Sequence, residues 1–157
     1  MRILFVGDVV GKVGRRLLKE QLRRAQTESG ADFTVVNVEN AAGGFGVTAS
    51  VWDELRRLPI DVYTSGNHIW DKKDTLALLD SEPRLLRPAN YPAGNPGRGH
   101  CVVASKGGVP VGDAPRELGA DPGGWYWPHV VFENRFGSSK RLKIGLDAGY
   151  RGHTGKN

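Results

Sequence analysis

The fold of this 157-residue chain is decided near its start, by the stretch Ile3–Asp8 (ILFVGD). Four apolar residues rich in branched side chains, closed by a glycine and a carboxylate, are typical of a short buried strand. The following residues, 12–25, have the apolar stripe of an amphipathic helix, and Gly30 is expected to end that helix. The stripe consists of Leu18, Leu22 and Ala25.

The alternation of strand and helix continues to about residue 92. Residues 33–38 and 60–64 are the second and third expected strands, and a helix is expected after each of them. Strands that are separated by helices at this spacing pair in parallel through right-handed crossovers. The sequence therefore predicts an α/β fold with a mostly parallel sheet.

Polar residues mark where the second and third helices should begin. Ser50 with Asp53 resembles a capping box, and Asp71 is placed to cap the third helix. Pro59 is expected to end the second helix. The apolar faces expected for these two helices are Val51, Trp52, Leu55 and Leu58 for the second, and Leu76 and Leu79 for the third.

The regular pattern is lost in the later part of the chain. Nine glycines and five prolines fall within Gly94–Pro128, and no hydrophobic period persists there. Residues 130–132 and 142–146 are only weak strand candidates. We expect a βαβ region over residues 1–100, followed by an irregular, poorly ordered Gly/Pro-rich tail over residues 101–157.

Composition and charge exclude several classes of protein. No apolar run is long enough for a membrane helix, and the start lacks a signal-peptide pattern, so a cytoplasmic protein without a membrane partner is expected. The single cysteine, Cys101, excludes an internal disulfide and a multi-cysteine zinc site. A net charge of +5 is only a weak indication of anionic partners, because a solvated basic surface is the more common explanation of such a charge. RNA-derived ligands are permitted but not indicated, and association into a homo-oligomer stays open.

Polar side chains follow each of the three expected strands. Asp8 follows the first, Glu39 and Asn40 the second, and Asn67 and His68 the third. The carboxyl ends of parallel strands meet at one edge of the sheet, where open α/β sheets bind ligands. Oxygen donors with an imidazole suit a divalent ion such as manganese, iron or zinc. From the residues alone, ordinary turn and capping roles stay open as the alternative.

A glycine-rich segment, residues 42–46 (AGGFG), lies between the second strand and the second helix. One interpretation is that it lets the backbone approach the site closely, and the other is a flexible loop. Neither a P-loop nor a GxGxxG pattern follows the first strand.

Four motifs resemble the bacterial YmdB-type branch of the calcineurin-like metallophosphoesterases. They are Met1–Lys12, Asn37–Gly46, Ser65–Lys72 and Leu86–Pro92, so the resemblance covers residues 1 to about 100. It implies the N-terminal half of a four-layer α/β/β/α sandwich and a centre of two divalent metal ions (iron, manganese or zinc). It also implies hydrolysis of phosphodiesters such as 2′,3′-cyclic nucleotides by a hydroxide that the two metals activate.

The resemblance further implies roles for individual residues. Asp8 and Asn40 would bind the first metal, Glu39 would bridge the two metals, and Asn67 would bind the second. His68 would act as the proton donor to the leaving group.

Arg87 is a further candidate, for binding the substrate phosphate. It lies in a turn-rich stretch, Leu86–Pro92, that could present its guanidinium fork to a phosphate. Hydrogen bonding to loop carbonyls is the alternative role.

The later part of the chain departs from this family. Members are longer and supply three more histidine ligands, two of them in a Gly-Thr-His-x-His segment, whereas no His-x-His occurs here. His100, His129 and His153 match none of these positions. We expect a reading-frame shift or a truncated gene, with a genuine alternative C-terminus as the other explanation.

The missing ligands leave three functions open. The first is a metal-dependent phosphodiesterase, for which weak or no activity is expected from this chain. The second is a non-catalytic phosphate- or nucleotide-binding module, and the third is an inactive fragment of the enzyme.

Overall fold

The computed structural model of the chain describes residues 1–89, 91–92 and 94–112. Its main sheet consists of β1 (Ile3–Val6), β2 (Phe33–Asn37) and β3 (Val62–Thr64), in that order and all parallel. The predicted α/β class with a parallel sheet is therefore confirmed. The strand candidates at 130–132 and 142–146, as well as His129 and His153, lie outside the described residues.

The central strand β2 determines how the sheet is buried. Each of its five residues is buried, since β1 and β3 pair along its two sides and other elements pack against both faces. Burial on both faces favours apolar residues, which Phe33, Val35 and Val36 provide. The two buried polar side chains are paired, since Thr34 Oγ1 accepts from Gln26 Nε2 and Asn37 Oδ1 accepts from Glu39 N. In the register of the sheet, Val35 lies opposite both Phe5 and Val62.

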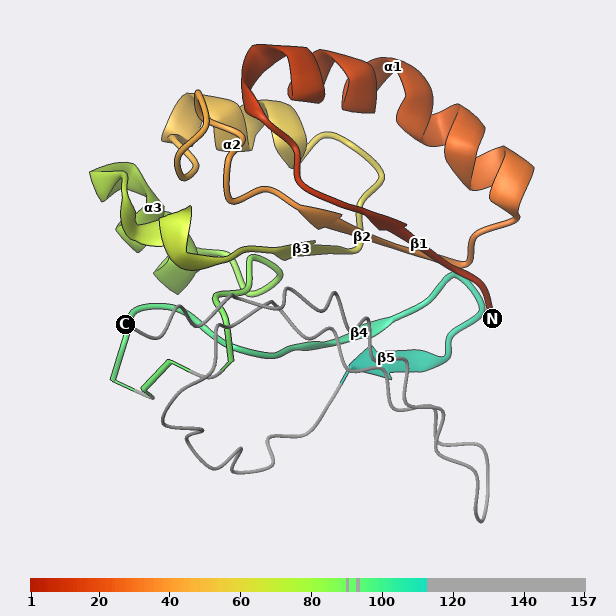
Figure 1. Ribbon diagram of the computed structural model, residues 1–157. Coiled ribbons are helices and arrows are strands. Elements are labelled where there is room, and N and C mark those ends of the chain that lie inside the picture. The colour runs from red at the N-terminus through yellow and green to blue at the C-terminus, as the bar shows by residue number, and fades with distance from the viewer. Residues whose placement is uncertain (90, 93, 113–157) are drawn as a thin grey trace, which may run out of the picture.

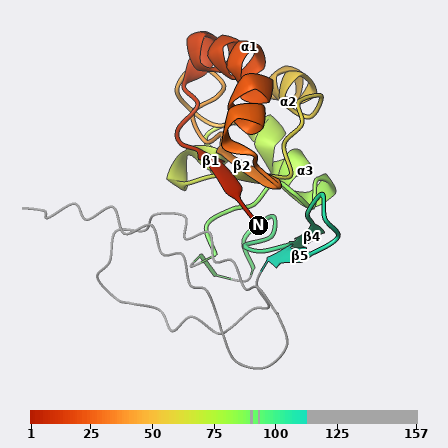
Figure 2. The same cartoon turned by 90° about the vertical axis from the view of Figure 1, so that its right-hand side faces the viewer.

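Helices cover one face of this sheet and a hairpin covers the other (Figure 1). The helices α1 (Gly11–Ser29) and α2 (Ala49–Leu55) lie on the same side. A 3₁₀ turn, η1 (Asn67–Trp70), and α3 (Lys73–Ser81) follow β3. Figure 2 shows the same arrangement from the side, with α1 and α2 above the sheet and the hairpin below.

The hairpin lies in the region where the sequence predicts no regular structure. It pairs β4 (Val102–Ala104) with β5 (Pro110–Gly112) in antiparallel fashion. Its strands have three residues each, too few to establish an alternating pattern in a glycine-rich sequence. Val111 packs against Phe33, Val35 and Val62, so that the hairpin covers the second face of the sheet.

The helix boundaries follow the predicted pattern with specific differences. Gly30 ends α1 in the left-handed conformation, as predicted, with φ 62°. The buried stripe of α1 includes Gln26, whose amide Nε2 donates to Thr34 Oγ1 (2.8 Å) and to the Pro59 carbonyl (2.7 Å). A buried glutamine is stable here because both donors of its amide are paired.

Two of the predicted caps are wrong. The N-cap of α2 is Thr48, whose Oγ1 accepts from Val51 N, while Ser50 bonds the Thr48 hydroxyl. The N-cap of α3 is Lys72, because Asp71 ends η1 instead. The inward side of α3 presents Thr75 and Leu79, and Leu76 is 39% exposed.

Candidate functional site

Hydrogen bonds between neighbouring segments align the carboxyl ends of the three strands. Past β1, Val9 N donates to the Asn37 carbonyl (3.1 Å), and past β2, Val38 N donates to the Thr64 carbonyl (2.9 Å). The side-chain oxygen of Asn37 accepts from Glu39 N (3.1 Å) and holds the turn after β2. The residues that follow the strands therefore emerge at one edge of the sheet.

Asp8 and Asn40 form a direct pair at this edge. Asn40 Nδ2 donates to both oxygens of the Asp8 carboxylate, at 3.0 and 2.8 Å. The Asn40 carbonyl accepts from Gly11 N (3.0 Å), which ties the loop after β2 to the first turn of α1. The amide oxygen of Asn40, Oδ1, is buried and has no hydrogen-bond partner among the described residues.

The carboxylate of Glu39 lies directly against the backbone of Gly66. A Cβ atom at position 66 would overlap both carboxylate oxygens, so the close approach requires glycine. Oε2 of Glu39 is buried and finds no hydrogen-bond donor within the described part of the chain. Burial raises the pKa of the Glu39 carboxyl, the backbone N–H of His68 opposes that rise, and the charge of Asp8 adds to it. A cation at this position would favour the charged form and reverse the rise.

His68 is held by two neighbours. Its Nδ1 lies 2.7 Å from Asp71 Oδ2, and Asp71 N donates to the His68 carbonyl (3.1 Å). The ring of Phe45 meets the imidazole edge to face, with centroids 5.1 Å apart and an interplanar angle of 74°. With Nδ1 engaged by Asp71, Nε2 is the ring nitrogen left for a ligand.

The glycine-rich loop brings its backbone close to His68, as the first of its two interpretations predicts. Gly46 has φ 66°, and a Cβ atom there would lie 3.2 Å from the His68 carbonyl oxygen. Hydrogen bonds close the loop, from Gly44 N to the Asn40 carbonyl (3.0 Å) and from Ala42 N to the Gly46 carbonyl (3.0 Å). The loop is thus a compact turn that carries Phe45 to the imidazole.

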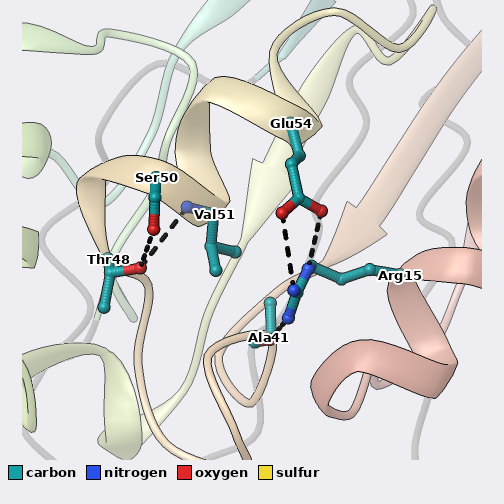
Figure 3. A network of polar contacts seen from close by, with 6 residues as sticks. All are labelled: Arg15, Ala41, Thr48, Ser50, Val51 and Glu54. Atoms are coloured by element: carbon teal, nitrogen blue, oxygen red, sulfur yellow. Dashed lines mark hydrogen bonds and ion pairs between the residues drawn. The ribbon is translucent and has the colours of Figure 1, made fainter.

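Arg15 lies between Glu54 and Ala41, the residue directly before this loop (Figure 3). Its Nη1 donates to the Ala41 carbonyl (2.6 Å), and its Nε pairs with Glu54 Oε2 (3.0 Å). The side chain of Arg15 is only 15% exposed, whereas that of Glu54 is 58% exposed. One residue of α1 therefore links α2 to the segment directly after Glu39 and Asn40.

Asn67 and Arg87 are placed differently from the others. Asn67 begins η1 after β3 and is exposed. Arg87 is buried, and its Nη1 donates to the carbonyls of Pro88 (2.9 Å) and Tyr91 (3.2 Å). Burial lowers the pKa of the Arg87 guanidinium. These contacts match the alternative role that the sequence suggests for Arg87, and phosphate binding by this residue stays a prediction.

The donor set suits a hard divalent cation in part. Two buried oxygen atoms on adjacent residues, Glu39 Oε2 and Asn40 Oδ1, lack donors within the described residues, and the Asp8 carboxylate lies beside them. Oxygen atoms without donors are what a cation would satisfy. Among the described residues, no group of three His, Cys, Asp or Glu side chains could hold a metal. A metal site at this edge would therefore need the amide oxygens of Asn40 and Asn67 as further ligands.

Sequence reasoning misses three residues that shape this edge. The sequence predicts that Asp71 caps a helix, although its spacing of three from His68 also permits a direct pair. Phe45 enters the sequence analysis only as part of a glycine-rich loop. Arg15 has no signal of its own, because its partners, Ala41 and Glu54, are distant in sequence.

The fold and this edge define an α/β protein whose polar residues gather at the carboxyl ends of parallel strands, the usual ligand position in such sheets. The model of the YmdB-like protein family matches residues 4–112. The chain belongs to this family. The match extends past residue 100 and includes the β4–β5 hairpin.

Relatives of the chain carry the names of phosphodiesterases or putative phosphatases. A Bacillus subtilis protein named 2′,3′-cyclic-nucleotide 2′-phosphodiesterase is 46% identical over 107 residues, which is 68% of this chain and 40% of that protein. The chain thus spans well under half the length of this relative.

Two solved structures share the fold. A hypothetical protein from Thermus thermophilus superposes with a TM-score of 0.63 at 39% identity, over 70% of this chain and 42% of that one. A structure described as a novel phosphatase from Mycoplasma pneumoniae gives a TM-score of 0.59 at 33% identity, over 64% and 37%. Within the described residues, none of the helices has the length and apolar character needed to cross a bilayer.

Proposed function

We propose that this chain carries the N-terminal part of a metal-dependent phosphodiesterase site, for substrates such as 2′,3′-cyclic nucleotides. The observation that supports it best is the pair of buried oxygen atoms of Glu39 and Asn40, which lack donors among the described residues beside the Asp8 carboxylate. The 46% identity to a Bacillus subtilis protein named 2′,3′-cyclic-nucleotide 2′-phosphodiesterase supports phosphodiester chemistry at this oxygen-lined edge.

Asp8, Glu39, Asn40 and Asn67 would hold the divalent metal, or two metals if the family resemblance applies in full. When bound there, such a metal supplies a Lewis acid for the charge that develops on the phosphate oxygens. The close packing of the Glu39 carboxylate on Gly66 holds this ligand in one position, which favours binding because less freedom is lost.

In its imidazolium form, with Nδ1–H donating to Asp71, His68 would deliver the second ring proton from Nε2 to the leaving oxygen. Phe45 limits the rotation of the imidazole by its edge-to-face contact. Arg87 would orient the phosphate only if a part of its guanidinium remains accessible, because Nη1 is already bonded to two carbonyls.

The test combines metal content with hydrolysis of a cyclic nucleotide. Asp8→Ala and Asn67→Ala should each reduce bound manganese or zinc, whereas His68→Ala should retain the metal and lose turnover. Asp53→Ala is the matched control, because Asp53 is an exposed aspartate paired with Arg56 on α2. Equal metal loss in all three site variants would contradict the role of His68.

The alternative of a binding module predicts a different result. In that case, the unsubstituted chain binds metal and nucleotide without turnover. The observation that favours it is that Asn67 is exposed, whereas the oxygen atoms of Glu39 and Asn40 that lack partners among the described residues are buried.

A further inference from the structure

A line of four basic residues runs along α1 from the edge that carries the candidate site. Lys12, Arg16, Lys19 and Arg23 are each exposed and follow one another at spacings of four, three and four residues. At about 100° per residue, these spacings keep all four within a narrow band on one side of the helix. We call these four residues the basic stripe.

Three arginines elsewhere in the helical layer form ion pairs, whereas the four residues of the basic stripe do not pair with any described residue. Arg15 pairs with Glu54, Arg24 with Glu28, and Arg56 with Asp53. Within the described part of the chain, none of the four stripe side chains forms an ion pair. The carboxylate of Glu20, on the same helix, lies roughly a fifth of a turn around the helix axis from the middle of the stripe. The stripe therefore presents positive charge that no carboxylate of the described residues neutralises directly.

The stripe begins next to the candidate site. Lys12 is the second residue of α1, four positions after Asp8, and its neighbour Gly11 donates to the Asn40 carbonyl (3.0 Å). From Lys12 to Arg23 the helix rises about 16 Å, a length that spans several phosphates of a nucleic-acid strand.

We propose that the basic stripe binds the phosphate backbone of a single-stranded RNA whose terminal phosphodiester lies at the site. The inference rests on the proposed function and deepens it, because it makes an oligonucleotide the substrate class. A 2′,3′-cyclic phosphate requires a ribose 2′-hydroxyl, so a polymer that ends in one is an RNA fragment. The phosphates upstream of such an end need a positively charged path away from the site.

An anionic membrane surface is less favoured as the partner of this stripe. α1 carries no aromatic residue, and its main apolar side, with Leu18 and Leu22, is buried against the sheet. Helices that lie in a membrane interface bury their apolar face in lipid and use aromatic anchors. Only Val13 and Leu17 are exposed large apolar residues within α1.

The experiment measures binding of a 5′-labelled single-stranded RNA of about ten nucleotides by fluorescence anisotropy over a range of salt concentrations. The stripe variant changes Lys12, Arg16, Lys19 and Arg23 to Gln, which keeps a similar helix propensity. The control variant changes Arg24, Arg56, Arg57 and Lys73 to Gln, an equal loss of charge at exposed positions.

We expect the stripe variant to bind at least about 10-fold more weakly at low salt. Its slope of log K against log salt should fall by about 3, since each phosphate contact on a single strand contributes about 0.7. The control variant should keep the slope of the unsubstituted chain. Equal weakening in both variants, or a slope near zero for the unsubstituted chain, overturns the proposal, and so does binding to anionic vesicles without binding to RNA.

A second assay separates this inference from the proposed function. The stripe variant should hydrolyse a cyclic mononucleotide as the unsubstituted chain does, because a mononucleotide does not reach along α1. If neither protein hydrolyses it while the difference in RNA binding persists, the result favours the binding-module alternative over a phosphodiesterase, and the RNA surface stands.

Discussion

His68 Nδ1 and Asp71 Oδ2 lie 2.7 Å apart, on residues three positions from each other around the 3₁₀ turn that follows β3. The pair is reinforced by the backbone bond from Asp71 N to the His68 carbonyl. The contact fixes one ring nitrogen and thereby determines which nitrogen is available to a ligand. Asp71 ends η1, so the N-cap position of α3 falls on Lys72, whose ammonium group has no acceptor for a side-chain cap.

The first prediction concerns this pair. Asp71→Ala should lower any hydrolytic turnover by about 10-fold or more, which is a part of the roughly 10²–10⁴-fold that a general acid contributes. Bound metal should be unchanged. The independent readout is the proportion of the imidazole tautomers of His68, measured by nitrogen NMR. The proportion of the Nδ1–H form should fall. Asp74→Ala is the control, since Asp74 bonds Ala49 N and not His68. An unchanged tautomer would contradict the positioning role.

The second prediction concerns Gly66. Gly66→Ala should destabilise the protein by about 1–3 kcal/mol, because a Cβ atom overlaps the Glu39 carboxylate. In a Glu39→Ala background the same substitution should cost much less, since the overlapping group is gone. Urea unfolding measures both free energies. Gly107→Ala, at a glycine with open space around it, is the control. Equal costs in both backgrounds would rule out the overlap as the cause.

The third prediction separates the two contacts of Arg15. Arg15→Ala should cost about 1.5–3 kcal/mol of unfolding free energy, since it removes a charged hydrogen bond to the Ala41 carbonyl in a partly buried position. Glu54→Ala should cost less than about 1 kcal/mol, because an exposed ion pair contributes little. Arg24→Ala, at a residue whose side chain is 73% exposed, serves as the matched control. A larger effect of Glu54→Ala than of Arg15→Ala would show that the ion pair dominates.

The fourth prediction is a pH dependence that originates in Tyr63. Burial raises the pKa of the Tyr63 hydroxyl from 10 to about 12, and this hydroxyl donates to the Leu55 carbonyl (2.9 Å). A raised pKa means that the folded state retains the proton more tightly, so the stabilisation is complete below about pH 10 and is lost between about pH 10 and 12. The loss should amount to about 3 kcal/mol.

Tyr63→Phe isolates this contribution. The variant should be about 1 kcal/mol less stable near neutral pH, because the Leu55 carbonyl loses its donor. From about pH 10 to 12, however, its unfolding free energy should fall less than that of the unsubstituted chain, since all other titrating groups are shared. Parallel pH profiles for the two proteins would refute the assignment.

Much of the fold follows from local patterns. The apolar run Ile3–Val6 forms the predicted strand with the predicted bounds, and Gly30 ends α1. These features were predictable because one period or one residue determines each of them. The same holds for the gathering of Asp8, Glu39 and Asn40 at one edge, which follows from parallel pairing alone.

Other features depend on contacts between segments distant in sequence. Gln26 is buried because Thr34 and the Pro59 carbonyl pair with its amide. The β4–β5 hairpin lies in a glycine-rich stretch and is stabilised by the packing of Val111 against the second face of the sheet. Neither feature has a local signal.

The sequence by itself determined the parallel α/β order and which residues follow each strand, because strand and helix periods and the resulting crossovers are local properties. Only the tertiary structure decided that Asp71 pairs with His68 and that the Glu39 carboxylate packs on Gly66. It also decided that Arg15 bonds the Ala41 carbonyl, directly after Glu39 and Asn40. The physical reason is that the sequence leaves several possible contacts open for each of these side chains. The packing of segments that are distant in sequence determines which contact forms.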